Sequence, residues 1–144
     1  ELAKNLHDDT SVFFHKKLEE QENRYKRHGN TEYNLEPNVK ETPGGLRDLQ
    51  LIDWISTHFF KKNNRRQLVS NKILSESDLD LLRNNESFLW RVRYEIHLHA
   101  NRIEERLLFD YQTYLAKKLG YFEEKKSLGV ERFMQDYYRG CIVN

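Results

Sequence analysis

Apolar side chains recur at every third or fourth residue in several stretches of the chain, which is the spacing of one face of an α-helix. The longest such stripe consists of Leu89, Val92, Ile96, Ala100, Ile103 and Leu107. A second stripe consists of Leu49, Ile52, Ile55 and Phe59 and predicts a helix over about 46–61. Ser75 and Asp78 form a capping-box pattern, with Asp in place of the usual Glu or Gln. We therefore expect a long helical stretch from there, either continuous or broken near 84–85.

Shorter patterns predict the remaining helices. One helix is expected over about 10–27 and another over about 110–119, with Gly120 just beyond its C-terminal end. A last helix begins near Val130 and has an apolar-aromatic face. Residues 67–73 fit either a short helix or an extended link.

Residues 30–45 lack helical periodicity. Apolar Tyr33, Leu35 and Val39 alternate with polar residues, and Pro37 interrupts the run, which favours a short extended segment near an edge. A Thr-Pro-Gly-Gly turn follows. The predicted fold class is all-α: a helical bundle-like domain with one short extended segment near its N-terminus.

Composition narrows the function classes. The 144 residues include six Gly and two Pro, too few for the many turns of a β-sandwich or barrel. The 24 Lys and Arg nearly balance the 23 Asp and Glu, giving a net charge of +1. A nucleic-acid partner is disfavoured because affinity for phosphates rests on a surplus of basic residues. No apolar run approaches the roughly 20 residues that span a bilayer, so we expect no membrane partner.

The chain has one cysteine, Cys141, which excludes an intrachain disulfide and a thiolate metal site. A reducing, cytoplasmic setting is the natural interpretation. The chain begins at Glu1 without Met and ends at Asn144, directly after an apolar-aromatic stripe. We therefore interpret residues 1–144 as a single helical domain and a fragment of a longer, multidomain protein.

The richest local feature is the sequence NLEPNVKETPGGLRDLQ over 34–50. Two glycines before a helix allow backbone amides to approach an anion, and two cations and two acids surround them. The six candidate residues are Glu36, Lys40, Gly44, Gly45, Arg47 and Asp48. One interpretation is part of a nucleotide or metal-phosphate site. The other is a structural helix entry, in which Asp48 complements the helix dipole. The spacing is not that of a P-loop.

Two further candidates carry weaker signals. Trp90, Tyr94 and His97 share one helix face beside basic residues, which fits either base stacking or a core edge whose arginines pair with glutamates. His97 and His99 lie about 200° apart on a helix, so they cannot bind one metal ion together. No nucleophile-base pair involves Cys141. We assign no metal ligand and no catalytic residue on this basis.

Several blocks, taken together in order, resemble the bacterial PII uridylyltransferase/uridylyl-removing family. They are NLEPNVK at 34–40 with PGGLRDLQ at 43–50, FLWRVRYEIHL at 88–98, RLLFDYQ at 106–112 and VERFMQDYYR at 130–139. The resemblance covers nearly the whole chain from about Phe13. It is far more specific than any single motif in the sequence.

The resemblance implies a cytosolic nitrogen-sensing enzyme. Its nucleotidyltransferase domain uses Mg²⁺ and transfers UMP from UTP to a tyrosine of the PII signal protein. An HD-type hydrolase domain removes UMP, and C-terminal ACT domains sense glutamine. This chain resembles the helical domain that follows the transferase core, so its partners would be PII and the other domains of the same protein. No cofactor is expected to bind tightly to the fragment.

The resemblance also implies a role for the loop, with 30–45 adjoining the transferase core. Lys40, Gly44, Gly45 and Arg47 would contact the nucleotide phosphates, and Glu36 or Asp48 would serve as an accessory acid. The fragment alone is expected to be inactive, with no catalytic residue of its own. The alternative is a helical protein–protein interaction module without chemistry. A Gly-Ser followed by Asp-x-Asp in the preceding sequence would favour the transferase.

Overall fold

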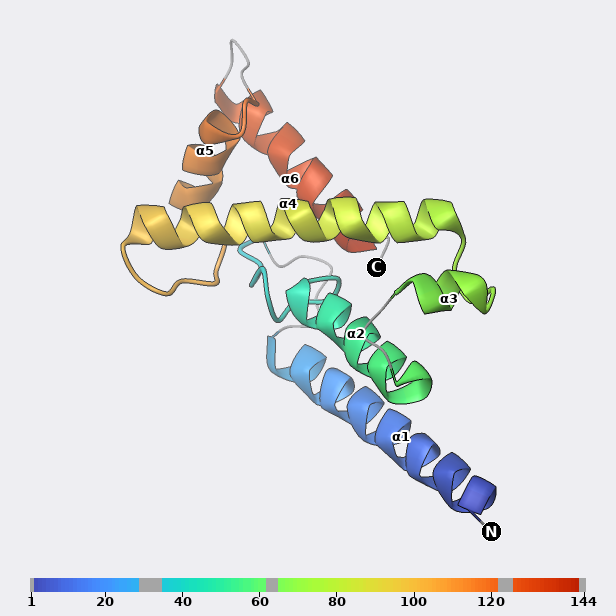
Figure 1. Cartoon of the computed structure of the whole chain (residues 1–144). Coiled ribbons are helices and arrows are strands. Elements are labelled where there is room, and N and C mark those ends of the chain that lie inside the picture. Colours follow the sequence, from blue (N-terminus) through green and yellow to red (C-terminus); the bar gives the residue numbers. More distant parts are fainter. Residues whose placement is uncertain (1, 29–34, 62–64, 122–125, 143–144) are drawn as a thin grey trace.

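The computed structural model describes residues 2–28, 35–61, 65–121 and 126–142, and six helices account for most of them. The helices are α1 (Leu2–His28), α2 (Leu46–Phe60), α3 (Arg66–Ser70), α4 (Glu76–Ala100), α5 (Phe109–Lys118) and α6 (Lys126–Ile142). The predicted all-α class is confirmed (Figure 1). Within the described ranges, no helix is long and apolar enough to cross a membrane.

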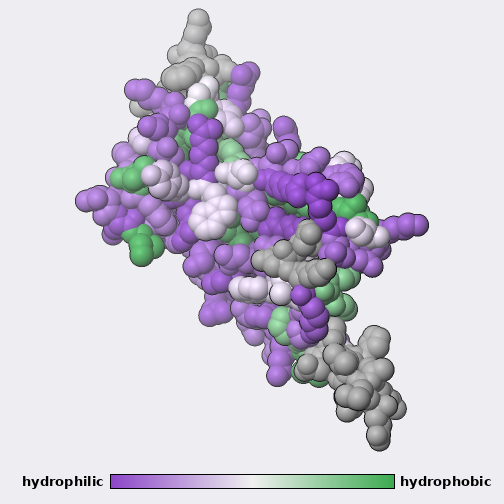
Figure 2. Space-filling model, in the orientation of Figure 1, coloured by the Kyte–Doolittle hydropathy of each residue, from purple (hydrophilic) through white to green (hydrophobic). Residues whose placement is uncertain are grey.

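The long helix α4 organises the molecule (Figure 1). It contacts α2 and α3 on one side and α5 and α6 on the other, while α1 packs against α2. The end of α1 that carries the N-terminus extends away from the rest of the molecule. The visible face in Figure 2 is mostly hydrophilic, with hydrophobic residues scattered over it.

The hydrophobic core lies where α2, α4, α5 and α6 meet. Its fully buried side chains are Val39, Leu49, Leu89, Val92, Ile96, Leu107, Leu115, Phe133 and Tyr137. Three of these, Leu89, Val92 and Ile96, form the inner face of α4, as the sequence periodicity predicted. The core also includes Val39 and Leu107, which lie outside the helices, so the non-helical segments are part of the packing.

Helix α4 is continuous from Glu76 to Ala100, and the alternative with a break near 84–85 is wrong. The predicted capping box is present at its start, between Ser75 and Asp78. Asn85 does not end the helix. Its side-chain nitrogen donates to the Gly140 carbonyl of α6 at 3.1 Å. A polar residue inside the helix therefore connects two packed helices.

The predicted helical stripe does not extend beyond Ala100. Asn101 adopts a left-handed conformation with φ 51° and ends α4, so the chain turns away from the helix axis. Ile103 is consequently 82% exposed, and its inclusion in the apolar helix face that the spacing predicted is wrong. Leu107 is buried by another route, since its backbone amide donates to the Pro37 carbonyl at 2.8 Å.

Two predicted boundaries also differ from the structure. Helix α1 begins at Leu2 rather than near residue 10, because nothing in the preceding residues breaks a helix even though they lack a regular apolar stripe. Helix α6 begins at Lys126 rather than near Val130. The 67–73 segment, for which two structures were open, contains the short helix α3. Gly120 has the expected positive φ, 89°, just beyond α5.

The extended segment is short and pairs with the chain that follows α4. Asn38 forms an isolated antiparallel bridge with Arg106, and the Val39 amide donates to the Glu105 carbonyl at 2.8 Å. Val39 is buried and Leu35 is exposed. Residues 30–34, including Tyr33, lie outside the described residues. The pairing holds the start of the glycine loop against the core.

Candidate functional site

The Pro-Gly-Gly loop turns directly into α2, whose N-cap is Gly45. Three amides at the helix entrance donate to carbonyls of the segment before it. These bonds run from Gly45 to Thr42, from Leu46 to Val39 and from Arg47 to Lys40, at 2.9–3.1 Å. The entrance of α2 is therefore closed by backbone hydrogen bonds from within the loop.

The two glycines are required by close packing. Gly44 has φ 75°, and a Cβ there would overlap the backbone of Cys141 in α6. A Cβ at Gly45 would lie 2.7 Å from the Val39 carbonyl oxygen. The amide of Gly44 donates to Oδ2 of Asp48 at 2.7 Å. The amides of both glycines thus donate within the chain in this structure, and their phosphate contact stays a prediction.

Asp48 joins the loop to α1. Its side chain is buried, and its two oxygens accept hydrogen bonds from four donors. Arg24 and Gln21 donate to Oδ1, the latter at 3.1 Å. The Tyr25 hydroxyl and the Gly44 amide donate to Oδ2 at 2.5 and 2.7 Å. Burial, together with this bond to Asp48, raises the pKa of Tyr25 to about 12. The geometry gives Asp48 a structural role; its role as an accessory acid stays a prediction.

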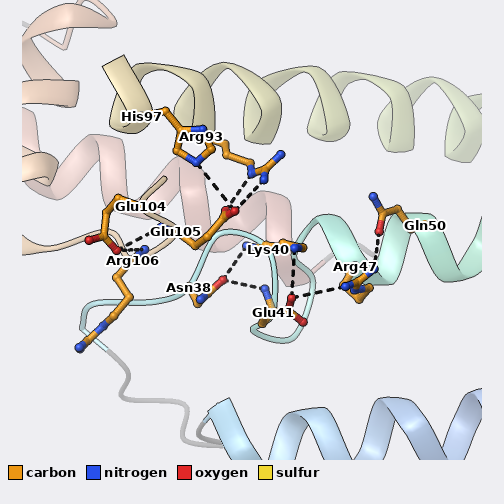
Figure 3. Close-up of polar contacts among 10 residues, drawn as sticks. All are labelled: Asn38, Lys40, Glu41, Arg47, Gln50, Arg93, His97, Glu104, Glu105 and Arg106. Atoms are coloured by element: carbon orange, nitrogen blue, oxygen red, sulfur yellow. Dashed lines mark hydrogen bonds and ion pairs between the residues drawn. The ribbon is translucent and has the colours of Figure 1, made fainter. Parts of the chain in front are cut away.

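Lys40 and Arg47 meet at the carboxylate of Glu41, as Figure 3 shows. The Lys40 Nζ lies 3.6 Å and an Arg47 guanidinium nitrogen 3.7 Å from the same oxygen, Oε1. Arg47 also donates to Gln50 at 3.1 Å, and its guanidinium lies 5.7 Å from the Trp54 ring centre. Lys40 and Arg47 expose 30% and 29% of their side-chain surface. The two predicted phosphate-side cations are thus brought together and remain accessible.

The backbone beneath this cluster is fixed by Asn38. Its Oδ1 accepts from the amides of Lys40 and Glu41 at 3.0 and 2.9 Å (Figure 3). Its carbonyl accepts from the amide and the hydroxyl of Thr42. One short side chain therefore sets the direction in which Lys40 and Glu41 leave the turn.

Glu36 belongs to a different part of the molecule from the Lys40–Arg47 pair. Its Oε1 accepts from the amide of Phe109, the first residue of α5, at 3.0 Å. Its Oε2 lies 3.4 Å from the Arg106 guanidinium. A carboxylate at the N-terminal end of α5 satisfies a free amide and complements the helix dipole. The accessory-acid role of Glu36 stays a prediction.

A second charged cluster lies beside the loop, at the end of α4 (Figure 3). Arg93 donates twice to Glu105, at 2.8 and 2.6 Å, and His97 Nε2 lies 3.8 Å from the same carboxylate. Burial raises the pKa of Glu105, but hydrogen bonds from Arg93 and the charges of Arg93, His97 and Lys40 outweigh it and lower the pKa overall. The alternative in which the arginines pair with glutamates is confirmed for Arg93.

Sequence reasoning missed Glu41 and Arg24, the two residues that complete the charge arrangement. Glu41 directly follows Lys40, so its proximity was available from the sequence. Arg24 gave no local signal, since it lies 24 residues from its partner Asp48. In the described part of the chain, no three His, Cys, Asp or Glu residues gather as a metal site would require.

Comparison with known proteins agrees with these motifs. The family profile described as GlnD PII-uridylyltransferase matches residues 12–141. A bifunctional uridylyltransferase/uridylyl-removing enzyme of Azotobacter vinelandii is 50% identical over 128 residues, 89% of this chain and 14% of that protein. The Pseudomonas aeruginosa protein of the same name is 50% identical over 127 residues, 88% of this chain and 14% of that protein. No solved structure matches the chain significantly.

The fold and the site define a class of all-α domain in which a Pro-Gly-Gly loop leads into a helix. Two cations, Lys40 and Arg47, lie together beside that loop. The chain belongs to the PII-uridylyltransferase family. It spans about one seventh of the length of the curated relatives that it matches.

Proposed function

We propose that this chain is the helical domain of a bifunctional enzyme that transfers UMP from UTP to a tyrosine of PII and removes it by hydrolysis. The observation that carries the proposal is the convergence of Lys40 and Arg47 on one accessible point beside the Pro-Gly-Gly loop. The names of the relatives support the reaction, and the match over residues 12–141 supports the domain. We place the parent protein in the cytoplasm.

In this proposal, Lys40 and Arg47 contact the phosphates of UTP. Phosphoryl and nucleotidyl transfer place negative charge on phosphate oxygens, and fixed positive groups stabilise that charge. Gln50 and Trp54 hold the Arg47 guanidinium, and Asn38 holds the backbone of Lys40. The cations are thus oriented before the nucleotide binds, which reduces the entropic cost of the contact.

Mg²⁺ would supply charge neutralisation and alignment of the triphosphate when bound. The described residues contain no group of three metal ligands, so they do not fit a complete Mg²⁺ site. We propose that carboxylates from other domains of the parent protein hold the ion. The contribution of this chain is the pair of cations and the rigid loop that carries them.

We propose a packing role for Gly44 and Gly45 alongside the predicted phosphate contact. Their amides donate to Asp48 and Thr42, and a Cβ at either position would meet backbone atoms. They allow the loop to approach α6 and the preceding turn closely. In this way the two glycines position Lys40 and Arg47 beside the loop.

A second function, that of an interaction module, is favoured by one surface. Trp90, Tyr94 and Leu98 are exposed and follow each other at four-residue spacing along α4, opposite its buried face. Exposed apolar side chains in contiguous arrangement are typical of contact surfaces. We propose that this face of α4 meets PII or another domain of the parent protein, which is compatible with the phosphate-contact role.

We expect Lys40→Ala and Arg47→Ala in the full-length enzyme to lower the rate of UMP transfer roughly 10²-fold, because each removes a charge that stabilises the transition state. The thermal midpoint should stay nearly unchanged, since both side chains are partly exposed. UMP removal, which we assign to another domain, should persist. Both activities and a thermal melt are measured for each variant.

Lys117→Ala is the matched control, because Lys117 is an exposed cation in the last turn of α5. It should leave transfer unchanged. Normal transfer by both site variants, or early unfolding of both, would leave the structural helix entry as the correct interpretation of the loop.

We expect the 144-residue chain alone to be catalytically inactive. Within the part of the chain that the structure describes, no three possible metal ligands lie together. Lys40 and Arg47 by themselves provide no nucleophile or base. The measurement is incubation with PII, UTP and Mg²⁺, followed by mass spectrometry of PII. Multiple turnovers of uridylylation by this chain alone would contradict the proposed division of labour.

A further inference from the structure

Glu41 places a carboxylate oxygen between the two cations of the site. The same Oε1 atom lies 3.6 Å from Lys40 and 3.7 Å from Arg47, and the group exposes 19% of its side-chain surface (Figure 3). Each member of the cluster is held from behind by a group outside it. Asn38 accepts from the amides of Lys40 and Glu41, while Gln50 accepts from Arg47. An anion is therefore already present where the cations converge.

We propose that Glu41 is an internal anion that occupies the position of a nucleotide phosphate oxygen in the free protein and is displaced when the triphosphate binds. The inference rests on the proposed function, because it assumes that Lys40 and Arg47 receive phosphate. It adds a residue that competes with phosphate for both cations. Glu41 itself does not contact the reacting atoms.

The distances favour displacement over permanent pairing. Charge-assisted hydrogen bonds measure about 2.7–2.9 Å, and both contacts of Glu41 are longer. An ion pair of this kind at a partly exposed site is weak and screened by salt. A triphosphate carries several negative charges and several oxygens, so it can contact both cations more closely than one carboxylate oxygen does. Exchange of Glu41 for phosphate is therefore favourable.

The neighbouring cluster shows what a permanent arrangement looks like. Glu105 also faces two basic side chains, but Arg93 donates to it twice, at 2.8 and 2.6 Å. Two short, parallel hydrogen bonds hold the Arg93 guanidinium and the Glu105 carboxylate firmly together. Glu41 has no such short contact with Lys40 or Arg47 in the described geometry. The difference separates a structural carboxylate from a displaceable one.

The internal anion also affects which anions bind to Lys40 and Arg47. While Glu41 lies between the cations, it reduces their combined positive potential, so singly charged anions compete poorly for the site. A triphosphate overcomes this competition through its larger charge. Removing the Glu41 charge should therefore strengthen the binding of every phosphate ligand, including ligands that normally bind weakly.

The test uses Glu41→Gln in the full-length enzyme, because glutamine keeps the size of the side chain and removes its charge. We expect the KM for UTP to fall about 3- to 10-fold, the effect of removing one like charge a few ångströms from the ligand in a hydrated site. Inhibition by inorganic triphosphate should tighten by a similar factor. The value of kcat and the thermal midpoint should change little, a division that loss of a structural contact would not produce.

Glu131→Gln is the matched control, since Glu131 is exposed on α6 and the substitution makes the same change in net charge. It should leave the KM and the triphosphate inhibition unchanged. In a variant that combines Glu41→Gln with Lys40→Ala and Arg47→Ala, the KM should not fall and the inhibition by triphosphate should not tighten. The two cations for which Glu41 competes are then absent.

The outcomes separate the two proposals. An unchanged or raised KM in Glu41→Gln, together with impaired transfer in Lys40→Ala and Arg47→Ala, overturns the internal anion and leaves the phosphate contact intact. Normal transfer and normal triphosphate inhibition in the two cation variants overturn both. Equal gains in Glu41→Gln and Glu131→Gln would show a general charge effect and would also overturn the internal anion.

Discussion

Replacement of Asp48 by Ala should destabilise the 144-residue chain by about 3–5 kcal/mol, because it leaves a buried charge without its partner. Arg24 is only 6% exposed, and its guanidinium is paired with Asp48. The hydroxyl of Tyr25 and the amide of Gly44 lose their acceptor in the same change. The measurement is urea denaturation of the variant and the unmodified chain.

Asp110→Ala provides a matched control. Asp48 and Asp110 both lie in the first turn of a helix, but Asp110 is exposed. Its removal should cost only the helix-dipole contribution, about 0.3–1 kcal/mol. Replacing Arg24 by Met together with Asp48→Ala should recover part of the loss, since no buried charge then remains. Similar losses for Asp48→Ala and Asp110→Ala would show that the buried network contributes little.

Truncation of Ile96 to Ala should destabilise the chain by about 2–5 kcal/mol. Ile96 is completely buried on the inner face of α4, between Val92 and the core residues of the neighbouring helices. Its removal leaves a cavity in addition to the lost burial of apolar surface. Denaturant melts should show a lower midpoint with little change in slope, as expected for loss of native packing.

Leu98→Ala is the control for Ile96→Ala. Leu98 lies two residues further along the same helix and is 57% exposed. Surface changes of this kind usually stay within about 0.5 kcal/mol. Equal losses for the two variants would contradict the assignment of the inner face of α4.

The order of helices and the inner face of α4 followed from the sequence because helical periodicity is a local property. Burial of Leu89, Val92 and Ile96 repeats at the spacing of one helix face. The family was also accessible from the sequence, because the loop and helix motifs keep their order and spacing. The end of α4 was not accessible from the sequence, since the apolar spacing continues to Ile103 and Leu107. Asn101 ends the helix with a left-handed residue, and an apolar pattern alone does not reveal that change.

The chemistry of the loop was only partly predictable. The sequence placed Lys40 and Arg47 on either side of the glycines, and the structure brings their charged ends to one carboxylate. The sequence did not show that the amides of Gly44 and Gly45 donate within the chain. Whether an amide is free depends on which acceptors fold against it, and those acceptors include a side chain of α2.

The sequence by itself determined the family, the all-α class and the position of the Pro-Gly-Gly loop before a helix. Only the tertiary structure decided the partners of the charged residues. Asp48 pairs with Arg24 across 24 residues, and Glu36 accepts from Phe109 across 73. Arg65 joins Asp53 to Glu86 in the same way, with nitrogen–oxygen distances of 2.6 and 2.7 Å. Helical spacing indicates which residues share one face. The partner of a charged side chain, in contrast, is decided only when separate elements pack together.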